Sequence, residues 1–273
     1  MGRYGPLWAA GLAGAAGTGA PERPNLYTVS RGNSANSRVT AFGRSYVTLH
    51  NNTLEKPIHR LKEAAPLIRK DTQVAVTFLP GEELEQRVEA AALARADLAT
   101  QLVQEFTSLA GVMGKHYATR EGLDAPLCEA IFEAALPRSS GDILPSSPAG
   151  IAVAVADRLD TLAGLFAVVG APKATADPFG LRRAAYGAVQ ALVASNSGCD
   201  LRAALAEAAA LQPVECGDKV VDECLEYMTR RLEQYLVDSG CGVEAVRAVL
   251  AERGGDPAPA AVTARALDAA IVG

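Results

Sequence analysis

The apolar run from Ile151 to Ala156 constrains the fold of this chain more than any other feature. It follows Ser147, a favourable N-cap residue, and Pro148, which the first turn of a helix tolerates. Gly170 then supplies a helix stop. A helix that is apolar on every side lies in the centre of a domain. The sequence therefore predicts a buried central helix over Ser147 to about Val169, with other elements packed around it.

The rest of the chain also favours helices. Hydrophobic residues make up 49% of the sequence but aromatic residues only 5%, and alanine supplies much of the apolar fraction. Alanine favours helices, whereas strands favour β-branched and aromatic residues, so we expect an all-α fold. Apolar residues at helical spacing predict further helices over Glu82–Leu109, Pro126–Leu136, Asp177–Ala194, Leu201–Leu211, Lys219–Val237, Val243–Ala251 and Ala260–Ile271.

Charge is unevenly spread along the chain. Residues 1–70 hold ten Lys and Arg against three Asp and Glu, whereas residues 71–273 hold 16 basic and 28 acidic residues. An acidic body argues against a free-standing nucleic-acid binder, because such affinity comes mostly from neutralised phosphates. Any RNA contact must use a local patch or a partner, and we expect no DNA partner. No stretch has the roughly 20 apolar residues that cross a bilayer, so we expect no membrane partner.

Motifs for catalysis, cofactors and metals are absent from the sequence. There is no GxxxxGK[ST] phosphate loop and no GxSxG elbow. Five scattered cysteines form no CxxC pair, which indicates reduced thiols rather than a disulfide framework or a zinc site. His116 has no Ser or Cys partner in the sequence, which favours a surface or packing role. We therefore expect no catalytic residue, no metal and no bound cofactor in this chain.

The first 50 residues contain five arginines and a single acid, Glu22. That composition is typical of an organelle transit peptide, and it also fits a plain disordered leader. Residues 1–45 lack periodicity and are rich in Gly, Ser and Asn, so we interpret them as a disordered leader or transit-like segment.

Three runs occur in a fixed order and spacing: ARADLATQLVQEFTSLAGVMGKHYA (Ala94–Ala118), LPRSSGDILPSSPAGIAVAVADRLDTLAGLF (Leu136–Phe166) and DPFGLRRAAYGAVQALV (Asp177–Val193). Together they resemble the β subunit of bacterial-type glycyl-tRNA synthetase, in its plant and algal chloroplast or mitochondrial form. The resemblance implies an HD-domain-like helical bundle over residues 82–198. Residues 199–273 would lead into a truncated anticodon-binding domain, and residues 46–81 are a poorly matched connecting segment. The chain would thus be part of a longer protein.

The same resemblance implies a share in glycine–tRNA ligase, which attaches glycine to its tRNA with ATP. This chain would be non-catalytic and would dock the tRNA and the α part of the synthetase. The α part, separate or fused, would use ATP and Mg. The location implied is chloroplast or mitochondrion, with cytoplasm as the alternative.

The HD fold binds a divalent metal through an H…HD…D set. Ala96 stands where this resemblance places a histidine, and it is followed by Asp97, while Asp157 corresponds to the last aspartate. Two acids without imidazoles do not build the usual site. We therefore interpret these as degenerate HD positions with structural roles, in which the acids satisfy helix ends or pair with one of four arginines, Arg95, Arg158, Arg182 or Arg183. A metal-dependent HD-type phosphohydrolase, and a helical interaction scaffold that does not bind RNA, remain alternatives.

Six basic residues are candidate tRNA contacts through the phosphate backbone, which positions an RNA without reading its sequence. Four are expected in loops or at helix ends, and two lie early in the helix that Asp177 caps. Adjacent helical residues point about 100° apart, so one of these two would face inward and one outward. The six are Lys115, Arg120, Arg138, Lys173, Arg182 and Arg183.

Overall fold

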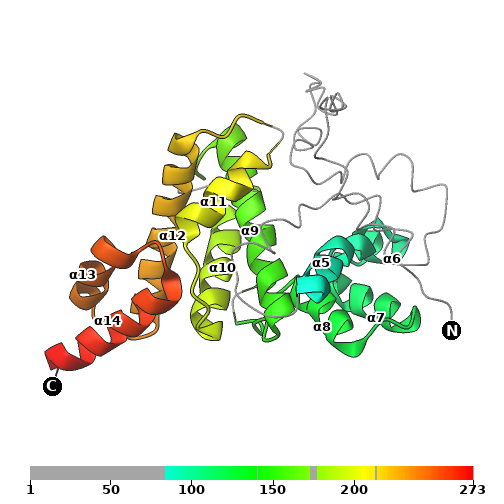
Figure 1. Ribbon diagram of the computed structural model, residues 1–273, viewed down its shortest axis with the longest axis horizontal. Coiled ribbons are helices and arrows are strands. Elements are labelled where there is room, and N and C mark those ends of the chain that lie inside the picture. Colours follow the sequence, from blue (N-terminus) through cyan, green and yellow to red (C-terminus); the bar gives the residue numbers. More distant parts are fainter. Residues whose placement is uncertain (1–83, 140, 173–176, 213, 273) are drawn as a thin grey trace. The chain divides into compact units, whose positions relative to one another are not determined.

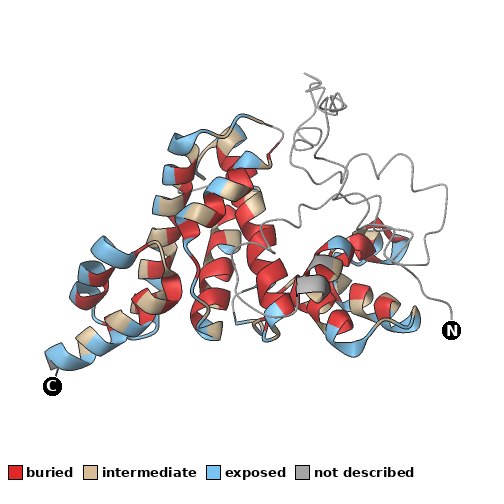
Figure 2. Ribbon diagram, viewed as in Figure 1, coloured by how far each residue is buried: buried red, intermediate tan, exposed pale blue. Residues whose placement is uncertain are grey.

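Helix α9 (Pro148–Val169) is the element around which the described helices pack (Figure 1). Every residue from Ala149 to Leu159 is buried (Figure 2). The Ser147 hydroxyl accepts a hydrogen bond from the backbone N–H of Gly150 at 3.0 Å, and the helix ends at Gly170. The predicted central helix is confirmed, together with its cap and its stop.

The structure is a computed structural model that describes residues 84–139, 141–172, 177–212 and 214–272. These residues belong to one compact unit, Phe42–Gly273. They form helices joined by turns, with no strand among them, which confirms the all-α prediction. The helices that contact α9 are α5 (Leu84–Leu93), α8 (Ala125–Glu133), α10 (Leu181–Ser195), α11 (Leu201–Ala210) and α12 (Asp218–Asp238). The others are η2 (Ala96–Ala99), α6 (Gln101–Glu105), η3 (Thr107–Leu109), α7 (Val112–Arg120), α13 (Val243–Arg253) and α14 (Pro257–Val272).

The single helix expected from Glu82 to Leu109 is wrong. The described part of this segment is divided into α5, η2, α6 and η3, and the first break falls at Arg95, whose φ of 64° is left-handed. A left-handed residue cannot continue a right-handed helix. The break turns Ala96 and Asp97 into the core, where both are buried. The spacing of apolar residues does not reveal the break, because Val103 of α6 is buried like apolar residues of α5 and η2.

Helix α7 was not predicted from the sequence, because glycines lie at its start and within its first turn. Gly111 has a φ of 80°, which a residue with a side chain rarely adopts. At Gly114, a Cβ would lie 3.0 Å from the Ile131 side chain and 3.3 Å from the Asp97 carboxylate. Glycine at this position therefore lets α7 pack closely against α8.

Helix α10 begins at Leu181, four residues after the predicted cap, yet Asp177 still caps it. Its two carboxylate oxygens accept from the backbone N–H groups of Leu181 and Arg182, each at 2.8 Å. The predicted end of the second helix at Leu136 is also too late, since α8 ends at Glu133. The remaining helices were predicted to within about three residues at either end, the range over which helix ends are normally ambiguous.

The helices on the two sides of Asn196–Gly198 share one core, since α11 and α12 pack against α9 and α10. The domain boundary at residue 198, the HD-like assignment and the anticodon-binding assignment stay predictions. The segments 1–45 and 46–81 lie outside the described residues. All five cysteines are free thiols, as predicted. None of the described helices is both long and apolar enough to span a membrane.

Candidate functional site

Asp97 is fixed by the start of helix α7. One of its carboxylate oxygens accepts hydrogen bonds from the backbone N–H groups of Gly111, at 2.7 Å, and Gly114, at 3.0 Å. These N–H groups belong to the N-terminus of α7, where backbone donors lack partners within the helix and the helix dipole favours an anion. Asp97 is therefore a long-range helix cap, supplied by a residue 14 positions before the N-cap residue itself.

Asp157 has a structural role that differs from that of Asp97. It projects from the buried part of α9 and forms an ion pair with the Arg95 guanidinium. The Asp157 side chain is 2% exposed and that of Arg95 is 28% exposed. The predicted pairing of Asp157 with a nearby arginine is thus present, and the left-handed turn at Arg95 delivers that arginine.

At the degenerate HD positions, Ala96 packs in the core, Asp97 caps α7 and Asp157 forms an ion pair with Arg95. Ala96 is fully buried, and the two acids each engage a separate partner. Across the described ranges, no group of three or more His, Cys, Asp or Glu side chains could hold a metal ion. The absence of bound metal stays a prediction for the chain as a whole.

The pH dependence of stability tests the Asp97 environment. Burial raises the pKa of Asp97 above 3.8, although hydrogen bonds from Gly111 and Gly114 and the charge of Arg95 oppose it. The folded chain therefore binds this proton more tightly than the unfolded chain. Its contribution to stability is full below pH 3.8 and is lost as pH rises through the folded pKa. In urea titrations at several pH values, the stability of wild type relative to Asp97→Asn should fall as pH rises toward neutrality. A stability difference between wild type and Asp97→Asn that does not change with pH would contradict a raised pKa for Asp97.

Two buried cysteines, Cys199 and Cys224, are held in the protonated form. Burial raises the pKa of Cys199 to about 12, with the nearby acids Asp256 and Asp200 adding to the effect. Burial also raises the pKa of Cys224. A thiol must lose its proton to act as a nucleophile, so these buried cysteines are inert at neutral pH.

Lys115 and Arg138 meet at the ring of Phe132. The Lys115 ammonium lies 5.5 Å from the ring centroid and the Arg138 guanidinium 5.7 Å, both within cation–π range. Each cation also pairs with an acid, Lys115 with Glu129 and Arg138 with Asp142. Hydrogen bonding from Arg138 lowers the pKa of Asp142 to about 2, so that ion pair persists at neutral pH. The structure therefore brings two predicted contacts together around an aromatic residue that the sequence had not singled out.

The other predicted contacts are more scattered. Lys115 lies inside α7 rather than in a loop or at a helix end, which corrects its expected setting, whereas Arg120 is the exposed last residue of the same helix. Arg183 is exposed and Arg182 is half-buried, as expected of neighbours on a helix. Lys173 lies outside the described residues.

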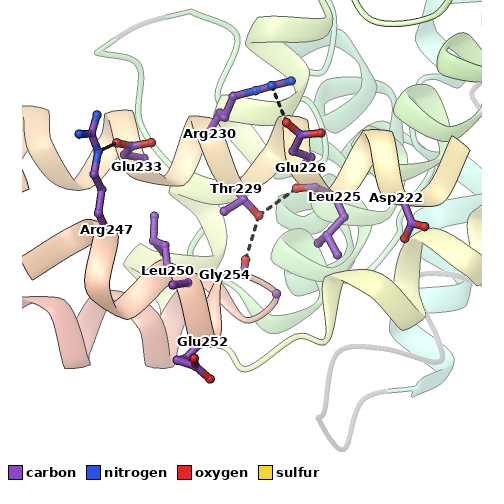
Figure 3. A pocket seen from close by; sticks show the side chains of 12 residues that line it. Asp222, Leu225, Glu226, Thr229, Arg230, Glu233, Arg247, Leu250, Glu252 and Gly254 are labelled. Atoms are coloured by element: carbon purple, nitrogen blue, oxygen red, sulfur yellow. Dashed lines mark hydrogen bonds and ion pairs between the residues drawn. The ribbon is translucent and has the colours of Figure 1, made fainter. Parts of the chain in front are cut away.

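A shallow groove of about 510 Å³ runs between α12 and α13 (Figure 3). Figure 3 shows Arg230 paired with Glu226 and Arg247 with Glu233 along it. Thr229 donates from its hydroxyl to the Leu225 carbonyl at 2.9 Å, with the Gly254 carbonyl 3.3 Å away. The acids lining the groove outnumber its two arginines, so it does not offer a surface for an RNA backbone.

A second basic and aromatic group lies on α12 and was also missed from the sequence. The guanidinium carbons of Arg230 and Arg231 lie 5.9 and 5.3 Å from the ring centroid of Tyr227. The spacing of three and four residues along one helix was the available signal, since it places side chains on a common face.

These features define an all-helical protein whose described part offers cations and aromatic rings at its surface and fixed acids inside. The family model for the glycyl-tRNA synthetase beta subunit matches residues 47–251. A chloroplastic/mitochondrial glycine–tRNA ligase of Arabidopsis thaliana is 44% identical over 212 residues, covering 78% of this chain and 19% of the relative. The glycine–tRNA ligase beta subunit of Klebsiella pneumoniae strain 342 is 41% identical over 179 residues, covering 65% of this chain and 26% of the relative.

The chain belongs to the glycyl-tRNA synthetase β subunit family, as its three sequence runs had indicated. A third relative, the beta subunit of Actinobacillus succinogenes, is 42% identical over 183 residues and is likewise covered to 26% of its length. The chain thus spans about a fifth to a quarter of these relatives.

Proposed function

We propose that this chain is a non-catalytic part of a glycine–tRNA ligase, and that it docks glycine tRNA and the α part of the synthetase. The observation that carries the proposal is the family match over residues 47–251. The role of the inner acids supports the non-catalytic assignment, because Asp97 caps α7 and Asp157 pairs with Arg95. Both acids are already engaged within the fold.

The tRNA surface that we propose centres on α7 and the segment after α8. Lys115 and Arg138 flank Phe132 there, and Arg120 is exposed at the end of α7. Their side chains donate hydrogen bonds in the geometry that phosphate oxygens accept. The phosphates of an RNA backbone would compete with Glu129 and Asp142 for the same cations, which favours release at higher salt.

The α part would supply glycine activation with ATP and Mg, as a separate chain or as a fused segment. The relatives named as beta subunits support a separate α chain. The Arabidopsis thaliana relative, named chloroplastic/mitochondrial, supports an organellar location. Assaying metal content together with nucleotide hydrolysis separates this proposal from an HD-type phosphohydrolase, since stoichiometric metal with turnover would refute the non-catalytic role.

Removing the exposed charges tests the tRNA surface. We expect the double variant Arg120→Gln, Lys115→Gln to bind glycine tRNA more weakly, with the salt dependence of log K shallower by up to about two units. The matched control is Arg202→Gln, because Arg202 is also exposed and ion-paired, with Asp222 on α12. Binding is measured by fluorescence titration over a range of KCl, with and without the α part.

If the double variant shows the same salt dependence of log K as wild type, Lys115 and Arg120 do not belong to the tRNA interface. If the wild-type chain fails to bind tRNA even with the α part present, the docking role itself is wrong. The helical-scaffold alternative then takes its place.

A further inference from the structure

Two tyrosines meet where α10 packs against α12. Tyr186 of α10 and Tyr235 of α12 are each half-buried, and their rings lie edge to face with centroids 5.9 Å apart. An edge-to-face contact fixes both rings, so little conformational entropy is lost when a ligand packs on them. The exposed part of each tyrosine is amphipathic, which suits a ligand that offers both a flat apolar surface and hydrogen-bonding groups.

An arginine lies one helical turn before each tyrosine. Arg183 precedes Tyr186 by three residues and Arg231 precedes Tyr235 by four, and these spacings place two side chains on the same face of a helix. Arg183 is exposed. Arg231 is half-buried, and its Nη1 donates to the side-chain oxygen of Gln234 at 2.9 Å. We call these two cations and two rings the α10–α12 aromatic strip: Arg183, Tyr186, Arg231 and Tyr235.

Neither arginine of the strip forms an ion pair with a residue that the structure describes, whereas Arg230 of α12 pairs with Glu226 and Arg247 of α13 pairs with Glu233. Acids are plentiful in this part of the chain, since residues 71–273 hold 28 acidic against 16 basic residues. Cations that stay unpaired beside aromatic rings form the combination that binds RNA, because guanidinium groups bind phosphate oxygens and rings stack on bases.

One acid, Asp238, lies close to Tyr186. Burial raises the pKa of Tyr186, and Asp238 and Tyr235 add to this rise, so the hydroxyl keeps its proton at neutral pH. A protonated hydroxyl can donate a hydrogen bond to a phosphate or to a base. The Asp238 carboxylate repels a phosphate, so the effect of its removal on RNA binding has a definite sign.

We propose that the α10–α12 aromatic strip binds a single-stranded segment of RNA, with an unpaired base stacked against the two tyrosine rings and the flanking phosphates held by Arg183 and Arg231. A single strand suits the strip because its bases are free to stack on aromatic side chains, whereas the bases of a duplex are stacked on one another. The assignment of this RNA to glycine tRNA rests on the proposed function. The affinity of the strip for a single strand does not, so a short unstructured oligoribonucleotide serves as the free probe.

The ring test replaces each tyrosine by Leu or by Phe in the full chain. We expect Tyr186→Leu and Tyr235→Leu to weaken binding of an oligoribonucleotide labelled with 2-aminopurine by about tenfold, because the stacking of a base on an aromatic ring is lost. Tyr186→Phe and Tyr235→Phe keep the ring and should stay within about twofold of wild type. Melting temperatures show whether each variant folds, and the charge test decides where a Leu variant does not. Equal affinities of the Leu and Phe variants would refute stacking.

The charge test uses variants of exposed residues. We expect Arg183→Gln to make the salt dependence of log K shallower by about one unit for both the oligoribonucleotide and glycine tRNA, because one phosphate contact is lost. Asp238→Asn should strengthen the binding of both. The matched control is Arg247→Gln, which removes an exposed arginine paired with Glu233 and should leave both slopes unchanged. Equal slopes for the two Gln variants, with unchanged affinity of Asp238→Asn, would refute the phosphate contacts.

The two probes separate this inference from the proposed function. If the oligoribonucleotide binds wild type and binds the strip variants more weakly, while glycine tRNA does not bind, the docking role fails and the strip stands as a single-strand site. If glycine tRNA binds wild type and every strip variant equally, and the oligoribonucleotide does the same, the strip is refuted and the docking role stands. If the strip variants weaken binding of the α part and leave RNA binding unchanged, the strip is a protein interface and the proposal is overturned.

Discussion

Arg95→Ala should destabilise the folded chain by about 3 kcal/mol, at the lower end of the range of about 3–5 kcal/mol for breaking a buried ion pair. The variant removes the Arg95 guanidinium from its ion pair with the Asp157 carboxylate, which is 2% exposed in the centre of the bundle. The lower end applies because the Arg95 side chain is 28% exposed, so part of its charge is already solvated in the native state. The free energy of unfolding is measured by urea titration, with the m-value checked for constancy.

The comparison variant for this prediction is Lys115→Ala. Lys115 and Glu129 also form an ion pair, but both side chains are more than 40% exposed, at 43% and 41%. Exposed pairs contribute about 0–1 kcal/mol, so Lys115→Ala should change stability little. Similar losses in the two variants would show that burial of Asp157 does not decide the cost.

Glu133→Ala should destabilise the chain by about 2–3 kcal/mol, because half-buried Ser147 loses the anion that its N–H and hydroxyl bind, and a hydrogen bond to a charged group contributes about 1.5–3 kcal/mol. Glu133 is 3% exposed, and its carboxylate accepts from the backbone N–H and the hydroxyl of both Ser146 and Ser147. These donors lead directly into α9, whose first turn would lose its anion. The loss is measured by urea titration, and Glu133→Gln should be milder because it keeps one acceptor oxygen.

Asp200→Ala provides the control for this second prediction. Asp200 also caps a helix, accepting from the Ala203 N–H at 3.0 Å at the start of α11, but it is exposed. Water replaces an exposed cap, so we expect a loss of about 1 kcal/mol. If Glu133→Ala costs no more than Asp200→Ala, the buried network around α9 contributes less than its geometry indicates.

Local patterns were enough to predict the features that depend on neighbouring residues. The Ser147 cap, the proline after it and the uniformly apolar run predicted α9, because each effect acts within one helix. Asp177 was similarly predicted as a cap for α10, and Asp157 was expected to pair with one of four arginines. The sequence left the choice among those arginines open, because it depends on where the chain turns at Arg95.

Features that join distant segments were not predictable in the same way. No local pattern indicates that Glu133 of α8 binds the serines that begin α9, or that Asp97 caps α7, since these contacts join residues 13 and 14 positions apart. The approach of Arg182 to Tyr227 likewise requires that α10 pack against α12. Helix α7 was missed because glycine lowers helix propensity, and the close approach of Ile131 and Asp97 that explains Gly114 is a tertiary contact.

At the start of three helices in this bundle, a carboxylate from a distant part of the chain accepts backbone hydrogen bonds. Asp97 serves α7, Glu133 serves α9, and Asp268 of α14 accepts from the Gly242 N–H that precedes α13, at 2.9 Å. A cut between a helix and the acid that caps it would separate them. One fragment would begin with unpaired backbone amides, and the other would keep a carboxylate that has lost its hydrogen-bond donors. Expression of the bundle in pieces is therefore expected to give unstable products unless each boundary keeps a helix together with the acid that caps it.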